Sequence, residues 1–149
     1  MDRNTVINGC INIEKSASSI YDKLMQIFPD KKEFWKNLFD DEIEHLSFLN
    51  DVTSLGLIDE IEKIDFLPSM SVINKTLKLA DTITEQITTS SISLEDALKM
   101  MLKLEKSLVE TYTNKLIARL ISCDEGGGEK LIIDEKTHID KIQEMIKVI

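Results

Sequence analysis

The stretches DEIEH at residues 41–45 and DEKTH at residues 134–138 decide the fold of this 149-residue chain, because each follows a second repeated stretch. EKSASSIY at residues 14–21 precedes the first, and EKSLVETY at residues 105–112 precedes the second. The two copies keep nearly the same internal spacing, which is typical of a duplicated structural unit. We interpret each copy as a hairpin of two long antiparallel helices.

Apolar residues around all four stretches recur every three or four positions, as on the buried face of an α-helix. Pro29 breaks the first pattern, and Asp30 with Glu33 predicts a capping box that opens the second helix. Ser93 with Asp96 likewise predicts the start of the third helix. The expected buried stripes are Ile7, Ile11, Ala17, Tyr21, Leu24 and Phe28; Trp35, Leu38, Glu42, His45, Leu49 and Val52; Ala97, Met101, Glu105, Leu108, Tyr112 and Leu116; and Leu131, Glu135, His138, Ile142, Met145 and Ile149.

The segment between the second and third helices is too long for a hairpin loop. After Pro68 an apolar pattern predicts a further helix there, with the stripe Ile73, Leu77, Ala80, Ile83 and Ile87. A long connection of this kind returns the chain to the far end of a bundle. We therefore expect an all-α protein, a four-helix bundle with a helix-containing crossover between helices two and three. The single domain covers residues 1–149, with a hairpin at 5–56, the crossover at 57–92 and a hairpin at 93–149.

The register of the second hairpin predicts where it turns. Residues of antiparallel helices meet only if they lie at similar distances from the turn, since each residue adds about 1.5 Å. Glu105 and Glu135 satisfy this condition if the turn falls near residues 122–124. The glycines at 126–128 would then lie in the first turns of the last helix.

Charge and hydropathy restrict the partners. The formal net charge of −9 disfavours nucleic acid and anionic membranes, which would repel such a surface. No apolar stretch is long enough to span a bilayer, and the N-terminal residues lack the pattern of a signal peptide, so we expect a cytoplasmic protein. Cys10 and Cys123 are isolated, which predicts buried apolar positions rather than a zinc site or a disulfide framework.

Six acidic and imidazole side chains predict a site for two metal ions in the bundle core. In an ExxH sequence on a helix, the Glu and the His point from the same face and can reach one ion. Two such pairs, with one Glu from each of the other two helices, form the ligand set of dimetal carboxylate bundles. Both histidines of the chain lie in DExxH, and the expected ligands are Glu14, Glu42, His45, Glu105, Glu135 and His138.

The alternative is that these carboxylates lie on solvated helix faces, the usual place for Glu in a chain with 27 acidic residues. Their place on the apolar stripes argues against it, since buried carboxylates cost several kcal/mol each unless cations neutralise them. Iron is the expected metal, with manganese and zinc as alternatives. By symmetry, Glu42 and Glu135 would bridge the ions.

Further side chains are expected beside the ligands. Asp41 and Asp134 lie four residues before the histidines, where each can hold an imidazole N–H; the alternative is an ordinary surface acid. Tyr21 and Tyr112 lie two turns from the EKS glutamates, either as core residues or with a role beside the metals.

On these paired DExxH motifs and six ligand positions, the whole chain resembles the rubrerythrin and bacterioferritin branch of the ferritin-like superfamily. The resemblance implies a diiron centre that reduces peroxide or dioxygen, with Asp41 and Asp134 orienting histidines. Because the chain has no CxxC pair, and so no rubredoxin-type iron site, the electron donor would be a separate protein. A homodimer is expected, since ferritin-like bundles commonly pair.

Two departures from the family pattern limit the analogy. Rubrerythrins carry an additional Glu where this chain has Leu108, and ferritin cages add a helix after the fourth, whereas Ile149 still lies on the stripe. Three functions remain open. They are a diiron oxidoreductase, a ferroxidase or iron-handling protein, and a bundle that binds an inert metal without redox chemistry.

Overall fold

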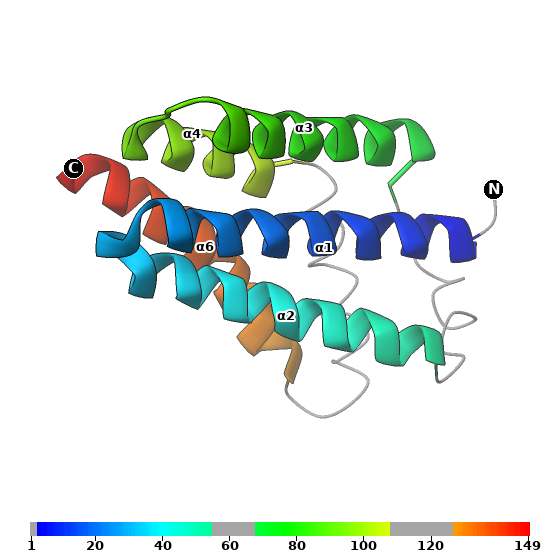
Figure 1. Cartoon of the computed structure of the whole chain (residues 1–149). Coiled ribbons are helices and arrows are strands. Elements are labelled where there is room, and N and C mark those ends of the chain that lie inside the picture. The colour runs from blue at the N-terminus through cyan, green and yellow to red at the C-terminus, as the bar shows by residue number, and fades with distance from the viewer. Residues whose placement is uncertain (1–2, 55–67, 108–126) are drawn as a thin grey trace.

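The computed structural model describes residues 3–54, 68–107 and 127–149, with side chains from residue 5 in the first part and from His138 in the last. Every regular element in these parts is a helix, which confirms the all-α class. In Figure 1, α1 lies between α2 on one side and α3 with α4 on the other. Helix α1 packs on α2 and α3, α3 packs on α4, and α4 packs on α6.

The first hairpin consists of α1 (Arg3–Ile27), the 3-10 helix η1 (Pro29–Lys31) and α2 (Lys32–Ser54). The residue before a proline is disfavoured in the α conformation, and Phe28 accordingly has φ −121° and ψ 71°. The 3-10 turn stands where the sequence predicted a capping box on Asp30. The buried residues of α2 are those of the predicted stripe, namely Trp35, Leu38, Glu42, His45, Leu49 and Val52.

Two serine caps begin the middle helices. Ser69 precedes α3 (Met70–Thr89) and its hydroxyl accepts a hydrogen bond from the Val72 N–H at 3.2 Å. Ser93 precedes α4 (Leu94–Glu105) and accepts from the Asp96 N–H at 3.0 Å, which confirms the predicted start. Such caps satisfy amide groups that the first helical turn leaves without a partner.

Helix α3, expected as part of a crossover, contributes to the core beside α1. Its buried residues are Ile73, Thr76, Ala80, Ile83 and Ile87. At its N-terminal end, Ile73 joins a cluster with Val6, Cys10 and Ile13. The burial of Cys10 agrees with its predicted apolar role, while Cys123 lies outside the described residues.

The second hairpin is described at its two ends. Helix α4 ends at Glu105, capped by Lys106, so the predicted stripe is visible through Ala97, Met101 and Glu105. Leu108, Tyr112 and Leu116 lie outside the described residues, as does the predicted turn at 122–124. Helix α6 (Gly127–Val148) begins in the glycine stretch, with Gly127 and Gly128 in its first turn.

Replacing Gly9 with alanine should destabilise the protein, although alanine gains about 1 kcal/mol in helix propensity. A Cβ at Gly9 would lie 2.7 Å from Cγ2 and 3.1 Å from Cδ1 of Ile73. Ile73 is fully buried and β-branched, so it cannot rotate away freely. We expect a net loss of about 1–3 kcal/mol in the free energy of unfolding, measured by chemical denaturation.

The same change in an Ile73→Ala background is the control. There the two clashing atoms are absent, so Gly9→Ala should be neutral or stabilising. A loss as large as that in the wild-type background would show that the close approach of α1 and α3 is not the cause.

Candidate metal centre

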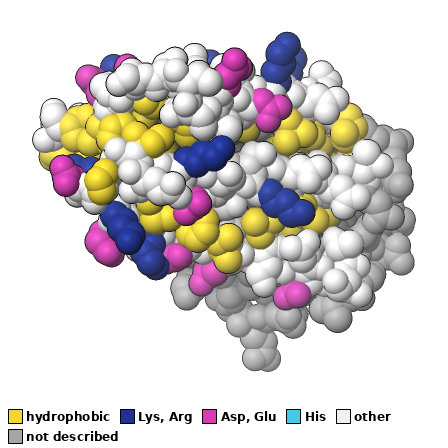
Figure 2. Space-filling model, viewed as in Figure 1, with side chains coloured by type: hydrophobic (Ala, Val, Ile, Leu, Met, Phe, Trp, Pro, Cys, Tyr) yellow, Lys and Arg dark blue, Asp and Glu magenta, His cyan; other side chains and the backbone are white. Residues whose placement is uncertain are grey.

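Four helices each place acidic or imidazole groups in the interior, where carboxylates are rarely found without a partner. Each of these side chains occupies a position on the otherwise apolar face of its helix. The packing that buries this face therefore also buries the charge. The five side chains are at most 5% exposed: Glu14 on α1, Glu42 and His45 on α2, Glu105 on α4 and His138 on α6. Neither histidine is visible on the face shown in Figure 2.

The first group joins α1 to α2. Glu14, Glu42 and His45 each offer a ligand atom within 4.8 Å of the others. His45 Nδ1 lies 4.0 Å from Glu14 Oε2 and 3.9 Å from Glu42 Oε2. These separations exceed hydrogen-bond lengths and leave room for an ion at about 2.0–2.2 Å from each atom.

The second group joins α2 to α4 and α6. It contains Glu42, Glu105 and His138, again with ligand atoms within 4.8 Å of one another. His138 Nδ1 lies 3.5 Å from Glu105 Oε1 and 3.8 Å from Glu42 Oε1. Residues far apart in the sequence therefore meet at one point.

Glu42 belongs to both groups and turns one oxygen toward each. Both of its carboxylate oxygens are buried, and neither has a hydrogen-bond partner among the residues that the structure describes. A buried carboxylate in that state costs several kcal/mol unless a cation compensates it. The donor set of carboxylate oxygens and imidazole nitrogens fits iron, manganese or zinc, so these residues can hold two metal ions.

Asp41 holds the imidazole of His138, and the hydrogen bond crosses from α2 to α6. The Nε2–H of His138 donates to Asp41 Oδ2 at 2.7 Å, which leaves Nδ1 to face Glu42 and Glu105. The sequence predicted that Asp41 could hold an imidazole N–H but did not indicate which ring. The structure shows that the ring is that of His138, whereas the His45 ring lies against Glu14 and Glu42. Carboxylates beside ligating histidines commonly fix their tautomer in this way.

Tyr21 lies beside the second group. Its hydroxyl donates a hydrogen bond of 2.6 Å to Glu105 Oε1, and the side chain is fully buried. The contact joins α1 to α4 across 84 residues of sequence. Tyr21 therefore fixes the orientation of a candidate ligand.

The charges of the site shift the pKa values of its members. Burial lowers the pKa of His138, but the hydrogen bonds with Asp41 and Glu105 raise it to about 10. Burial raises the pKa of Glu105, whereas the hydrogen bond and charge of His138 and the hydroxyl of Tyr21 bring it below its usual value. Burial also raises the pKa of Asp41, and His138 lowers it more. In the metal-free protein, the proton on His138 thus supplies positive charge that a metal ion would otherwise supply.

Three predicted site residues, Asp134, Glu135 and Tyr112, lie outside the residues whose side chains are described. The sequence did not single out Trp35 as a neighbour of the site, although it packs on Tyr21 with ring centroids 6.0 Å apart. The two residues lie at similar distances from Pro29 on facing helices, and this register was the available signal.

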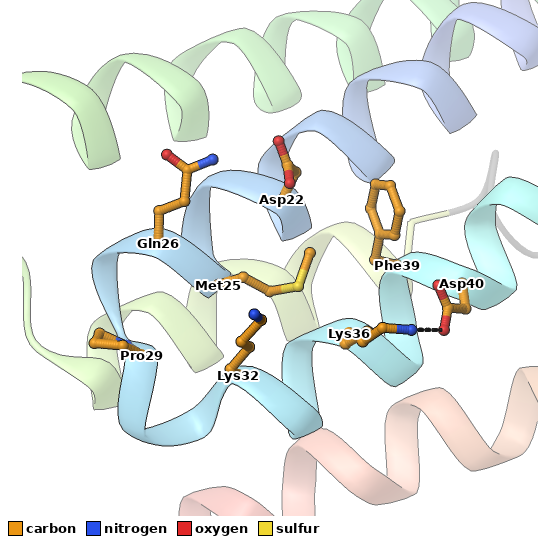
Figure 3. A pocket seen from close by; sticks show the side chains of 8 residues that line it. All are labelled: Asp22, Met25, Gln26, Pro29, Lys32, Lys36, Phe39 and Asp40. Carbon is orange, nitrogen blue, oxygen red and sulfur yellow. Dashed lines mark hydrogen bonds and ion pairs between the residues drawn. The ribbon is translucent and has the colours of Figure 1, made fainter.

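A surface groove of about 480 Å³ lies between α1 and α2, away from the buried groups. Figure 3 shows the ion pair between Lys36 and Asp40 on its α2 side, 2.8 Å long. None of the candidate ligands lines it. Its lining residues are Asp22, Met25, Gln26, Pro29, Lys32, Lys36, Phe39 and Asp40.

The fold and site together define a helical protein with two buried clusters of carboxylate and histidine groups that can hold metal ions. No protein-family model, curated protein or solved structure shows a match to the chain. Within the described parts of the chain, no helix is both long and apolar enough to cross a membrane.

Proposed function

We propose that this chain is a ferritin-like diiron protein that, like rubrerythrins, reduces peroxide or dioxygen with electrons from a separate donor protein. The observation that carries the proposal is Glu42, a buried carboxylate shared by two ligand groups with no hydrogen bond to either oxygen among the described residues. A carboxylate in this position is suited to bridge two cations.

The ligands divide between the two positions. Glu14 and His45 would hold one ion and Glu105 and His138 the other, with Glu42 between them. The predicted sixth ligand is Glu135. A bound pair of iron ions would supply the electrons that cleavage of an O–O bond requires.

The surrounding residues position the ligands and keep water out. Asp41 holds Nε2–H of His138 and so directs Nδ1 to the metal side. Tyr21 holds one oxygen of Glu105 at 2.6 Å. The apolar residues around Tyr21 and Trp35 are fully buried, which lowers the local dielectric constant and strengthens every charge interaction in the site.

Loading the full chain with iron and supplying a reductant should produce many turnovers of hydrogen peroxide per protein. Consumption of peroxide is measured against time, and iron per chain is measured by elemental analysis. The zinc-loaded protein is the matched control, because zinc accepts the same ligands but has no redox chemistry. The protein should bind zinc at the same positions, and the zinc form should consume no peroxide.

Two results would contradict the proposal. Oxidation of the iron once per chain, followed by accumulation of iron beyond two per chain, would identify an iron-handling protein. Equal inactivity of the iron and zinc forms, with both sites filled, would identify a binding module without redox function.

A further inference from the structure

A row of aromatic rings extends from the candidate metal centre toward the surface. Tyr21 and Trp35 are both fully buried, and their ring centroids lie 6.0 Å apart at an angle of 32°. The ring of Phe34 meets Trp35 edge to face, with centroids 4.9 Å apart. The three rings thus form a continuous row, Tyr21 to Trp35 to Phe34, on two facing helices.

The inner end of the row touches a candidate ligand. The Tyr21 hydroxyl donates to Glu105 Oε1 at 2.6 Å, a short hydrogen bond to a buried carboxylate. Oxidation of a phenol by one electron makes its proton strongly acidic, so an acceptor already in hydrogen-bond contact is needed. Glu105 is such an acceptor, and the proton has only to move along an existing bond.

The middle ring has a different environment. Trp35 Nε1 is buried and has no hydrogen-bond partner in the described part of the chain. An oxidised Trp35 therefore has no described base to take its indole proton and remains a strongly oxidising radical cation. After oxidation, the radical would therefore be located on Tyr21, and the radical on Trp35 would be short-lived.

The outer end of the row reaches a shallow groove. Phe34 is half-buried and lines this groove of about 290 Å³ together with residues of α6. These residues are Lys141, Glu144, Met145 and Val148. Phe34 therefore contacts Trp35 on one side and lines this surface groove on the other.

We propose that Tyr21 and Trp35 form a one-electron relay between the metal centre and the surface at Phe34. Its physiological use rests on the proposed function, because the electron acceptor is the oxidised metal site and the electron source is the external donor protein. Tyr21 gives one electron to the site as its phenolic proton moves to Glu105. Trp35 then returns one electron to Tyr21, which recovers the proton, and the donor reduces Trp35. The net transfer is one electron inward and no proton.

The step between the two rings can be tested without any metal, in the full-length metal-free chain. A laser flash at the red edge of the tryptophan band ionises Trp35, which is the only tryptophan in the sequence, and a scavenger removes the ejected electron. We expect the tryptophanyl radical absorption to decay as the tyrosyl radical absorption rises, at one rate that does not depend on protein concentration. Decay of the tryptophanyl radical without a tyrosyl signal would overturn the proposal.

Three variants identify the participants. Tyr21→Phe should abolish the tyrosyl signal, and persistence of that signal would also overturn the proposal, since another tyrosine would then be the acceptor. Glu105→Gln should slow the transfer, because an amide does not accept the phenolic proton. Phe39→Leu removes an aromatic ring elsewhere on the same helix and should leave the transfer rate unchanged.

A second measurement separates the relay from the proposed function. In the iron-loaded protein, Trp35→Phe should slow reduction of the oxidised site by a reducing protein, with the metal content unchanged. An unchanged rate of reduction would show that the relay does not carry electrons to the metal site, even if peroxide turnover is confirmed. Conversely, radical transfer in the metal-free chain would stand even if no turnover is found.

Discussion

Substituting Glu42 with methionine should remove both metal ions from the protein and at the same time stabilise the metal-free chain. Both effects follow from one position, because Glu42 belongs to both ligand groups and its oxygens are buried without a hydrogen bond within the described residues. Replacing such a charge with an apolar side chain of similar size should raise the free energy of unfolding by about 1–4 kcal/mol. Elemental analysis gives the metal content, and denaturant unfolding in chelator gives the stability.

Two variants serve as controls for this prediction. Glu44 lies two residues further on the same helix and is exposed, so Glu44→Gln should retain metal and stability. Glu14→Gln touches only the first group, so it should weaken one metal position and leave the other. If Glu42→Met still carried metal at the wild-type ratio, the shared-ligand interpretation would be wrong.

The contribution of His138 to the free energy of unfolding of the metal-free protein should fall as the pH rises from about 6.5 to about 10. The pKa of His138 is 6.5 when unperturbed and is raised to about 10 in the folded chain. A raised pKa contributes stability that is fully present below the unfolded value and is lost as the pH passes the folded value. Denaturant unfolding at a series of pH values in chelator measures it.

Metal binding should release the proton that His138 carries in the metal-free protein. His138 Nδ1 faces the candidate ligands Glu42 and Glu105, so an ion bound there displaces a proton, and apparent affinity should increase with pH up to about 10. Calorimetry in buffers of different ionisation enthalpy measures this release. Asp41→Asn weakens the charge that holds the proton, so both the pH-dependent loss of stability and the proton release at neutral pH should shrink. Equal behaviour of Asp41→Asn and wild type would contradict this account.

Much of the helical fold could be predicted because the stripes are unambiguous. All six residues predicted for the buried face of α2 are buried, including Glu42 and His45 among apolar neighbours. The Ser93 cap also follows directly from local chemistry, since the hydroxyl accepts from an amide three residues on. By contrast, α3 buries Thr76 where the pattern favoured Leu77, which is only half-buried. A threonine hydroxyl that bonds the carbonyl of Val72 can be buried at little cost, and periodicity alone does not show this.

Long-range partners were less accessible to prediction. The spacing of Asp41 and His45 indicated that an aspartate would hold an imidazole, but not that the partner would be His138, 97 residues away. Which imidazole Asp41 meets depends on the orientation of α6 about its own axis relative to α2. Many long-range contacts determine this orientation together. The same applies to Tyr21 and Glu105. Short-range spacing identifies the chemical groups, whereas packing decides which of them meet.

The position of the ligands along the chain has a mechanical consequence. Glu14 and His138 are far apart in the sequence, yet Glu42 brings both into one connected site. Metal ions held there would act as a reversible cross-link that closes a long loop of the polypeptide. The entropy that such a cross-link removes from the unfolded chain grows with the logarithm of loop length, so this cross-link would restrict the unfolded chain more than one between neighbouring helices.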